Sequence, residues 1–182
     1  AEEKVINYEI ERIDFVKTIQ EQENNEIIYL GRYSDKKFSA CCFNRLSKLF
    51  GEDLKVNVKN TLSTYIDTTY YELVNKDSNK VYLFENNENK IKLYDYYDSR
   101  FGNRTSISHT SFLADSSLNF PNGVKIGMSK REFTDLFFTN IPDSTYNEIE
   151  TFSICRLELG EDYTNYFFKN DSLKHIDFKW EY

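Results

Sequence analysis

The chain has 182 residues, a formal net charge of -7 and an aromatic content of 16%, with 14 Tyr and 15 Phe but only 2 Pro and 6 Gly. This length and this supply of large rings allow a packed core rich in strands, which excludes intrinsic disorder. The negative charge repels phosphate backbones, and no run of Lys and Arg interleaves with the aromatic residues, which argues against a nucleic-acid partner. No apolar run approaches the roughly 20 residues of a membrane span.

The start of the chain favours export. Ala1 stands in place of Met and the polar Glu2, Glu3 and Lys4 follow it, as expected after removal of a signal peptide or a lipoprotein leader. A trimmed cytosolic domain is the alternative. We therefore expect a periplasmic or cell-surface protein, with or without a lipid anchor on the removed leader.

Residues 1–35 carry mixed signals. Asp14 is a candidate N-cap for a short helix, and 26–33 resembles a strand that follows a polar connection. Whether this stretch belongs to the first folded unit or forms an appendage is left open.

The first folded unit is predicted to span 36–98. Its helix is expected at 43–50, where Phe43, Leu46, Leu49 and Phe50 share a helical spacing. Two strands are expected to follow within 69–86. A third covers 90–97 and places Ile91 and Leu93 on one face, so each unit takes the form of a helix and three strands.

A polar stretch separates this unit from the next. Residues 99–119 are rich in Ser, Thr, Asn and Asp, which is typical of a linker or a long surface loop. Pro121, Asn122 and Gly123 end it with a turn.

The second folded unit is predicted to span 120–182. Its helix contains Phe133, Leu136 and Phe137, and strands are expected at 148–159, 163–169 and 174–182, the last two joined by a turn at Asn170-Asp171. Strict alternation along the last strand indicates one buried face. We expect the following side chains to lie buried between sheet and helix: Cys155, Leu157, Ile176, Phe178 and Trp180.

The two units show a weak internal repeat. Residues 69–86 align without a gap on 153–170, and the alignment keeps Leu73 with Leu157, Tyr82 with Tyr166, Phe84 with Phe168 and Asn86 with Asn170. Identity at this level proves nothing alone, but a helix precedes three strands in both places. We therefore expect 36–98 and 120–182 to superpose.

The phrase Gly123-Val-Lys-Ile-Gly-Met-Ser-Lys-Arg-Glu-Phe133 carries a resemblance to a known family. Ser129 is a good N-cap and Glu132 completes a capping box, while Gly127 suits the tight reversal before the helix. The phrase resembles the opening helix of small outer-membrane lipoproteins of the SmpA/OmlA type, which share a fold with the β-lactamase inhibitor proteins. The match covers 123–182 directly. The first unit departs from it, because Ala40 stands where Gly127 does and no capping Glu follows.

The resemblance implies an α+β fold with two helix-plus-antiparallel-meander units in tandem, whose strands either form separate sheets or one continuous sheet. It also implies an envelope binding module without enzyme activity. It carries over a helix cap and no binding residue, and a fold does not fix a function.

The sequence offers little for catalysis or for metal binding. Only two histidines exist, His109 in the polar stretch and His175 on the polar side of the last strand, and both are expected to be solvated. The cysteines lack the spacing of a zinc site. At most one disulfide is available, from Cys41 or Cys42 to Cys155, and buried free thiols are the main expectation. We expect no catalytic residue, no metal and no cofactor, although a chance pair of carboxylates keeps an unrecognised enzyme as an alternative.

Surplus tyrosines supply the one candidate binding surface. Tyr94 and Tyr96 alternate with Ile91 and Leu93, which are expected in the core. Tyr70 alternates with Tyr71 and Leu73, which are also expected in the core. Tyr70, Tyr94 and Tyr96 should therefore lie on the open face of the sheet. Tyrosine with interspersed charge is typical of interface hot spots, although ordinary cross-strand packing explains it equally well. Our leading interpretation is a non-catalytic envelope binding protein whose open face meets a protein or polymer ligand. The alternative is a structural lipoprotein that scaffolds an envelope complex.

Overall fold

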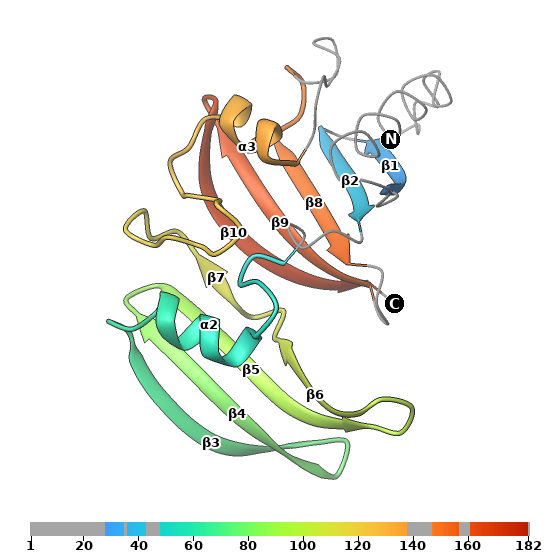
Figure 1. Ribbon diagram of the computed structural model, residues 1–182, viewed down its shortest axis with the longest axis vertical. Coiled ribbons are helices and arrows are strands. Elements are labelled where there is room, and N and C mark those ends of the chain that lie inside the picture. Colours follow the sequence, from blue (N-terminus) through green and yellow to red (C-terminus); the bar gives the residue numbers. More distant parts are fainter. Residues whose placement is uncertain (1–27, 35, 43–47, 138–146, 157–160, 182) are drawn as a thin grey trace.

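The protein is a mixed α+β structure built on one large sheet (Figure 1). The computed structural model describes residues 28–34, 36–42, 48–137, 147–156 and 161–181, with side chains placed at 36–39, 48–137, 147–154 and 163–179. Within these ranges there are two helices and a 10-stranded sheet whose pairs are mostly antiparallel. The predicted α+β class is confirmed, and the strands of both predicted units belong to one continuous sheet.

The elements follow one another in a simple order. The helices are α2 (Leu54–Thr61) and α3 (Lys130–Phe137). In chain order the strands are β1 (Ile28–Ser34), β2 (Lys37–Cys42), β3 (Ile66–Val74), β4 (Asp77–Asn86), β5 (Asn89–Asp98), β6 (Gly102–Ile107), β7 (Phe112–Leu113), β8 (Thr151–Arg156), β9 (Glu161–Lys169) and β10 (Ser172–Glu181). They lie side by side as β1-β2-β8-β9-β10-β7-β5-β4-β3, and β6 pairs with β5 off this path. Among the described strands, β2 and β8 are the one pair that runs parallel.

The first meander, β3-β4-β5, forms because short turns reverse the chain twice. Asn75 and Lys76 both have positive φ angles, which suits a two-residue hairpin turn. Helix α2 precedes this meander and begins at Asp53, whose side chain accepts a hydrogen bond from the backbone N–H of Val56 (3.4 Å). The helix buries Val58 against the sheet.

The helix predicted at 43–50 is wrong in its described part. Residues 43–47 lie outside the described residues, but Leu49 and Phe50 form a turn, closed by the hydrogen bond from the N–H of Gly51 to the carbonyl of Lys48 (3.0 Å). Gly51 has a φ of 71°, which ends any helical path. Leu49 and Phe50 are buried, but they enter the core from this turn. Their apolar spacing therefore reflects burial in the core and does not indicate a helix.

The second unit matches its prediction closely. The N–H of Ser129 donates to Oε2 of Glu132 (2.7 Å) and the N–H of Glu132 donates to Oγ of Ser129 (3.1 Å), so the capping box at the start of α3 is confirmed. Strands β8, β9 and β10 form the expected antiparallel meander. Asn170 and Asp171 form the turn with positive φ angles.

The burial predicted for this unit is confirmed where side chains are described. Ile176 and Phe178 are buried and belong to the hydrophobic core on the helix side of the sheet, as the alternation requires. The side chains of Cys155, Leu157 and Trp180 lie outside the described ones, as do both cysteines of the 41–42 pair.

The stretch 99–119, expected to be a linker or a long surface loop, contributes β6 and β7 to the sheet. Strand β7 is only two residues long, yet it joins the two meanders into one sheet. Leu113 pairs with Ile176 of β10, and Phe112 pairs with Lys90 of β5. Near the N-terminus, the strand expected at 26–33 is found as β1.

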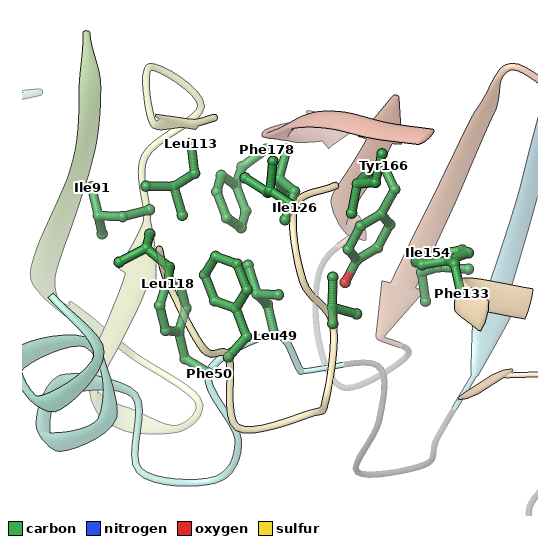
Figure 2. Close-up of a cluster of buried hydrophobic side chains, with 14 of the residues drawn as sticks. Leu49, Phe50, Ile91, Leu113, Leu118, Ile126, Phe133, Ile154, Tyr166 and Phe178 are labelled. Atoms are coloured by element: carbon green, nitrogen blue, oxygen red, sulfur yellow. The ribbon is translucent and has the colours of Figure 1, made fainter. Parts of the chain in front are cut away.

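One hydrophobic core runs under both helices, which cover the same face of the sheet (Figure 1). Figure 2 shows Phe50 and Phe178 at the centre of this core, with Ile91 on the side of the first meander and Tyr166 on the side of the second. Residues before α2 and residues of β10 therefore pack into a shared layer. The opposite face, which we call the open face, carries no described helix.

Candidate functional site

The three tyrosines predicted as ligand-binding residues do lie on the open face together. The strand register places Tyr70 beside Val81 and Val81 beside Tyr94, and Tyr96 follows two residues later on β5. Tyr70 and Tyr94 are half-buried, and Tyr96 is 37% exposed. The fully buried Val81 lies between the first two rings. The alternation of side chains along the strands therefore predicted this surface correctly. Two of its three rings, however, expose less surface to solvent than the sequence suggested.

A charged pair holds the two half-buried rings in place. The ammonium of Lys92 lies 4.9 Å from the ring centre of Tyr94 and 5.9 Å from that of Tyr70, within the range of cation–π attraction. Lys92 also forms an ion pair with Glu72 (2.7 Å), and the Tyr94 hydroxyl donates to the same carboxylate (3.2 Å). The result is a fixed polar cluster on the open face.

The protonation states of this cluster are well defined. Burial works against the charge of Lys92, but its hydrogen bonds with Glu72, Tyr94 and Tyr70 raise its pKa above the ordinary value. The hydrogen bond from Lys92 lowers the pKa of Glu72. Both groups are therefore ionised near neutral pH, and the cluster presents a persistent dipole between aromatic rings.

The prediction that two neighbours of Tyr70 face the core is wrong. Tyr71 and Leu73 were expected to face the core, but they are 68% and 77% exposed. They do lie on the helix side of β3. That strand is the last one in the sheet, however, and Lys55 of α2 reaches only as far as Asp95 of β5 and the ring of Tyr82 on β4. No described element covers the helix side of β3.

Exposed apolar side chains gather at one end of the first meander. Tyr97 and Phe101, at the turn from β5 to β6, are 74% and 41% exposed, and Leu73 and Val74 end β3 at the same end of the sheet (Figure 1). Such clusters of exposed aromatic residues mark contact surfaces. No pattern along the chain indicates this cluster, because it depends on which strand ends the sheet.

A cleft of about 620 Å³ opens where the sheet splits, which is within the range of ligand pockets, roughly 300–1,000 Å³. Beyond the short β7, strand β6 pairs with β5 and strand β10 pairs with β9, so the two strands diverge. The turn before α2 forms a third wall. The cleft is lined by Lys48–Lys55 in the chain before and at α2, by Asn103–Ile107 of β6, and by Tyr163, Thr164, Phe178 and Lys179 of β9 and β10.

Asp95 organises the wall of this cleft near α2. Its carboxylate accepts hydrogen bonds from Lys55 (2.9 Å), from the Tyr82 hydroxyl (3.1 Å) and from the Thr105 hydroxyl (2.6 Å). Burial works against its charge, but these three donors lower the pKa of Asp95 below its ordinary value. The carboxylate therefore stays ionised and keeps helix and strand in a fixed relation. This role is structural.

His175 is not the solvated residue that the sequence suggested. Its ring is half-buried and stacks on Phe167 at 4.2 Å, and Phe112 approaches it at 5.1 Å. Burial lowers the pKa of His175, and the nearby Asp177 only partly offsets this effect. His109 is exposed, as expected. Neither histidine lines the cleft.

The pKa of His175 predicts how stability depends on pH. Because the folded state disfavours the charged imidazole, the unfolded state binds more protons near pH 6, so stability is complete above about pH 6.5 and declines as the pH falls through that value. His175→Phe keeps a ring between Phe167 and Phe112 but cannot titrate. Urea unfolding from pH 7.5 to pH 5.5 should show a smaller decline for this variant than for the wild type. Equal declines would assign the effect to other groups.

Two features are missing from the described residues, a metal site and a membrane-spanning helix. Among them, no group of three His, Cys, Asp or Glu side chains is arranged to hold a metal ion. Within the same ranges, neither helix has the length and apolarity needed to cross a membrane. What the described surfaces offer is an aromatic open face and a cleft with a polar rim, both of which suit binding.

The resemblance of 123–133 to the lipoprotein family stays a prediction, since a capping box is a local feature that many proteins share. The confirmed cap explains why that phrase begins a helix, and it says nothing about ancestry. Comparisons with protein-family models, with curated proteins and with solved structures found no match to this chain.

Proposed function

We propose that the chain is a non-catalytic binding protein of the cell envelope that presents its open sheet face to a protein ligand. The observation that carries this proposal is the arrangement of Tyr70 and Tyr94 around the ion pair of Lys92 and Glu72, with Tyr96 further along β5 on the same face. Fixed aromatic rings offer contact area at a low entropic cost, and an ion pair between them adds specificity for a partner of matching charge.

The order of helices and strands supports this proposal. In each half a helix precedes an antiparallel meander, and in each half the last strand, β5 or β10, lies toward the centre of the sheet. We propose that the helix-and-meander parts of 36–98 and 120–182 descend from one repeated unit of the lipoprotein and inhibitor type; β2, at the start of the first segment, instead pairs with β8 of the second. Because proteins of that lipoprotein type are exported, we expect this chain to be exported as well. A lipid anchor on its leader would hold it at a membrane.

A scaffolding role is the second candidate. Strand β3 ends the sheet and exposes Ile66, Tyr71 and Leu73. A long, apolar edge strand readily pairs with another chain. An envelope complex held together through β3 would use this edge and leave the open face idle.

Two adjacent tyrosines give a matched test of the binding role. Tyr96 lies on the open face, whereas Tyr97 is exposed at 74% on the helix side of β5. We expect Tyr96→Ala to weaken capture of the envelope ligand about tenfold, the effect of losing an interface tyrosine worth about 1–2 kcal/mol. Tyr97→Ala should capture it as well as the wild type does. Quantitative mass spectrometry of proteins retained from an envelope extract gives the comparison.

A photo-crosslinking amino acid at position 96 should join the same ligand, and one at position 97 should not. If both substitutions leave capture unchanged while Leu73→Glu on β3 abolishes it, the scaffolding role replaces the binding role. Retention of a glycan polymer in place of a protein would change the ligand class but keep the surface.

A further inference from the structure

Two strand edges face each other across the cleft. Strand β6 pairs with β5 along Gly102–Ile107, and β10 continues past its last partner in β7, Asp177, as far as Glu181. In the part of the chain that the structure describes, no strand pairs with β6 on its other side. An unpaired edge of this kind is a template for a further strand.

The register of β6 shows which backbone groups point into the cleft. The N–H of Ser108 donates to the carbonyl of Lys92 (2.8 Å). Since bonded and non-bonded pairs alternate in an antiparallel ladder, Ser106 and Arg104 also bond to β5. The N–H and carbonyl groups of Thr105 and Asn103 are then directed to the outer edge. These four groups are spaced as a guest strand requires.

The charges on the rim favour acidic side chains. Among the cations that line the cleft, Lys48 is paired with Glu52 and Lys55 with Asp95. Arg104 lies 4.9 Å above the ring of Phe101, and Lys179 is exposed. Neither of these two has a carboxylate within ion-pair distance among the described residues. Asp53, whose carboxylate caps α2, also lines the cleft at its α2 wall, so an acidic guest meets Arg104 and Lys179 away from that wall.

The floor of the cleft is apolar. Leu49, Phe50 and Phe178 line it and belong to the shared core (Figure 2). They lie on the helix side of the sheet, whereas the register places the side chains of Arg104 and Lys179 on the open side. Successive side chains of a strand point to opposite faces.

We propose that this cleft binds an extended peptide segment by strand addition to β6, with an apolar side chain directed to Phe50 and Phe178 and acidic side chains on either side of it directed to Arg104 and Lys179. Recognition of this kind takes affinity from main-chain hydrogen bonds and specificity from alternate side chains. It does not use Tyr70 or Tyr94 of the open face, although Arg104 is the strand partner of Tyr96.

A peptide of alternating glutamate and valine, blocked at both ends and labelled with a fluorophore, is the probe. Fluorescence anisotropy with the full chain should show saturable binding, and the counterpart with lysine in place of glutamate should bind at least about tenfold more weakly. N-methylation of alternate residues blocks one edge of a strand at a time, so one of the two methylated versions should lose binding and the other should keep it. Equal binding of both methylated versions, or full competition by free glutamate, would overturn strand addition.

Proline and its matched controls test the protein side. Thr105→Pro removes an outward N–H, and proline is tolerated where that group makes no sheet hydrogen bond. Thr105→Val removes only the hydroxyl that binds Asp95. The proline variant should bind the peptide about tenfold more weakly than the valine variant. This is the effect expected when one main-chain hydrogen bond is lost and the proline ring occupies space at the edge of β6.

A second pair guards against misfolding. Asn103→Pro should also weaken binding, and Asn103→Ala should not, with circular dichroism confirming that the four variants fold. Lys179→Glu should weaken the glutamate peptide and strengthen the lysine peptide. Tyr70→Ala, on β3 and separated from β6 by β4 and β5, should leave peptide binding unchanged, which separates this site from the tyrosine cluster around Lys92. If both folded proline variants bind as the wild type does, the cleft does not accept a strand at β6.

Discussion

Phe133→Ala should destabilise the protein by about 3–5 kcal/mol, the usual cost of removing a buried phenylalanine. Phe133 is fully buried on α3, and its ring centre lies 4.7 Å from that of Tyr166, 5.1 Å from Phe152 and 5.2 Å from Phe168. The truncation would leave a cavity between helix and meander that aromatic rings cannot collapse into. Urea unfolding followed by far-ultraviolet circular dichroism measures the loss.

Phe101→Ala is the matched control, since the same atoms are removed from a ring that is 41% exposed. A change within about 0.5 kcal/mol is expected there, as for most surface positions. A small effect at Phe133 would mean that α3 contributes little to the core, and the assignment of the helix face would then be wrong.

The second unit could be predicted from the sequence because its signals are local. The capping box of Ser129 and Glu132 lies within four residues, and the alternation of Ile176 and Phe178 lies within one strand. Such patterns depend on backbone period and on hydrogen-bond geometry alone. Such patterns therefore do not depend on how the rest of the chain folds.

The first unit was predicted less well because its features depend on distant partners. Leu49 and Phe50 have helical spacing but are buried by the shared core, and the helix starts at Leu54, after its N-cap Asp53. The exposure of Leu73 depends on β3 being the last strand of the sheet. No pattern within β3 reveals which strand ends a sheet.

The candidate surfaces also differ in how far they could be predicted from the sequence. Parity within β5 was enough to place Tyr94 and Tyr96 on the open face. The ion pair of Lys92 with Glu72 joins two strands that are not adjacent, and the cleft joins β6 with β10. Both require the strand order, which one sequence does not specify.

Phe50→Ala should cost about 3–5 kcal/mol as well, and it tests whether the two halves fold as one unit. Phe50 is buried, packs edge-on against Phe120 (5.7 Å between ring centres), and shares the core with Ile91 of the first meander and Tyr166 of the second. Because that core is continuous, the loss should appear in both meanders. Hydrogen exchange at the amides of Leu93 and Tyr166 should accelerate by the same factor, as in a single cooperative unit.

Two independently stable repeats would behave differently. The amide of Leu93 would then exchange faster, while the amide of Tyr166 would keep its protection, because each repeat would open by itself. Phe120, the edge-on partner of Phe50, supplies a check from the other side of the same contact. Phe120→Ala should reproduce the effect on both amides, because this pair lies between the meanders and a cavity on either side of it weakens the layer that joins them.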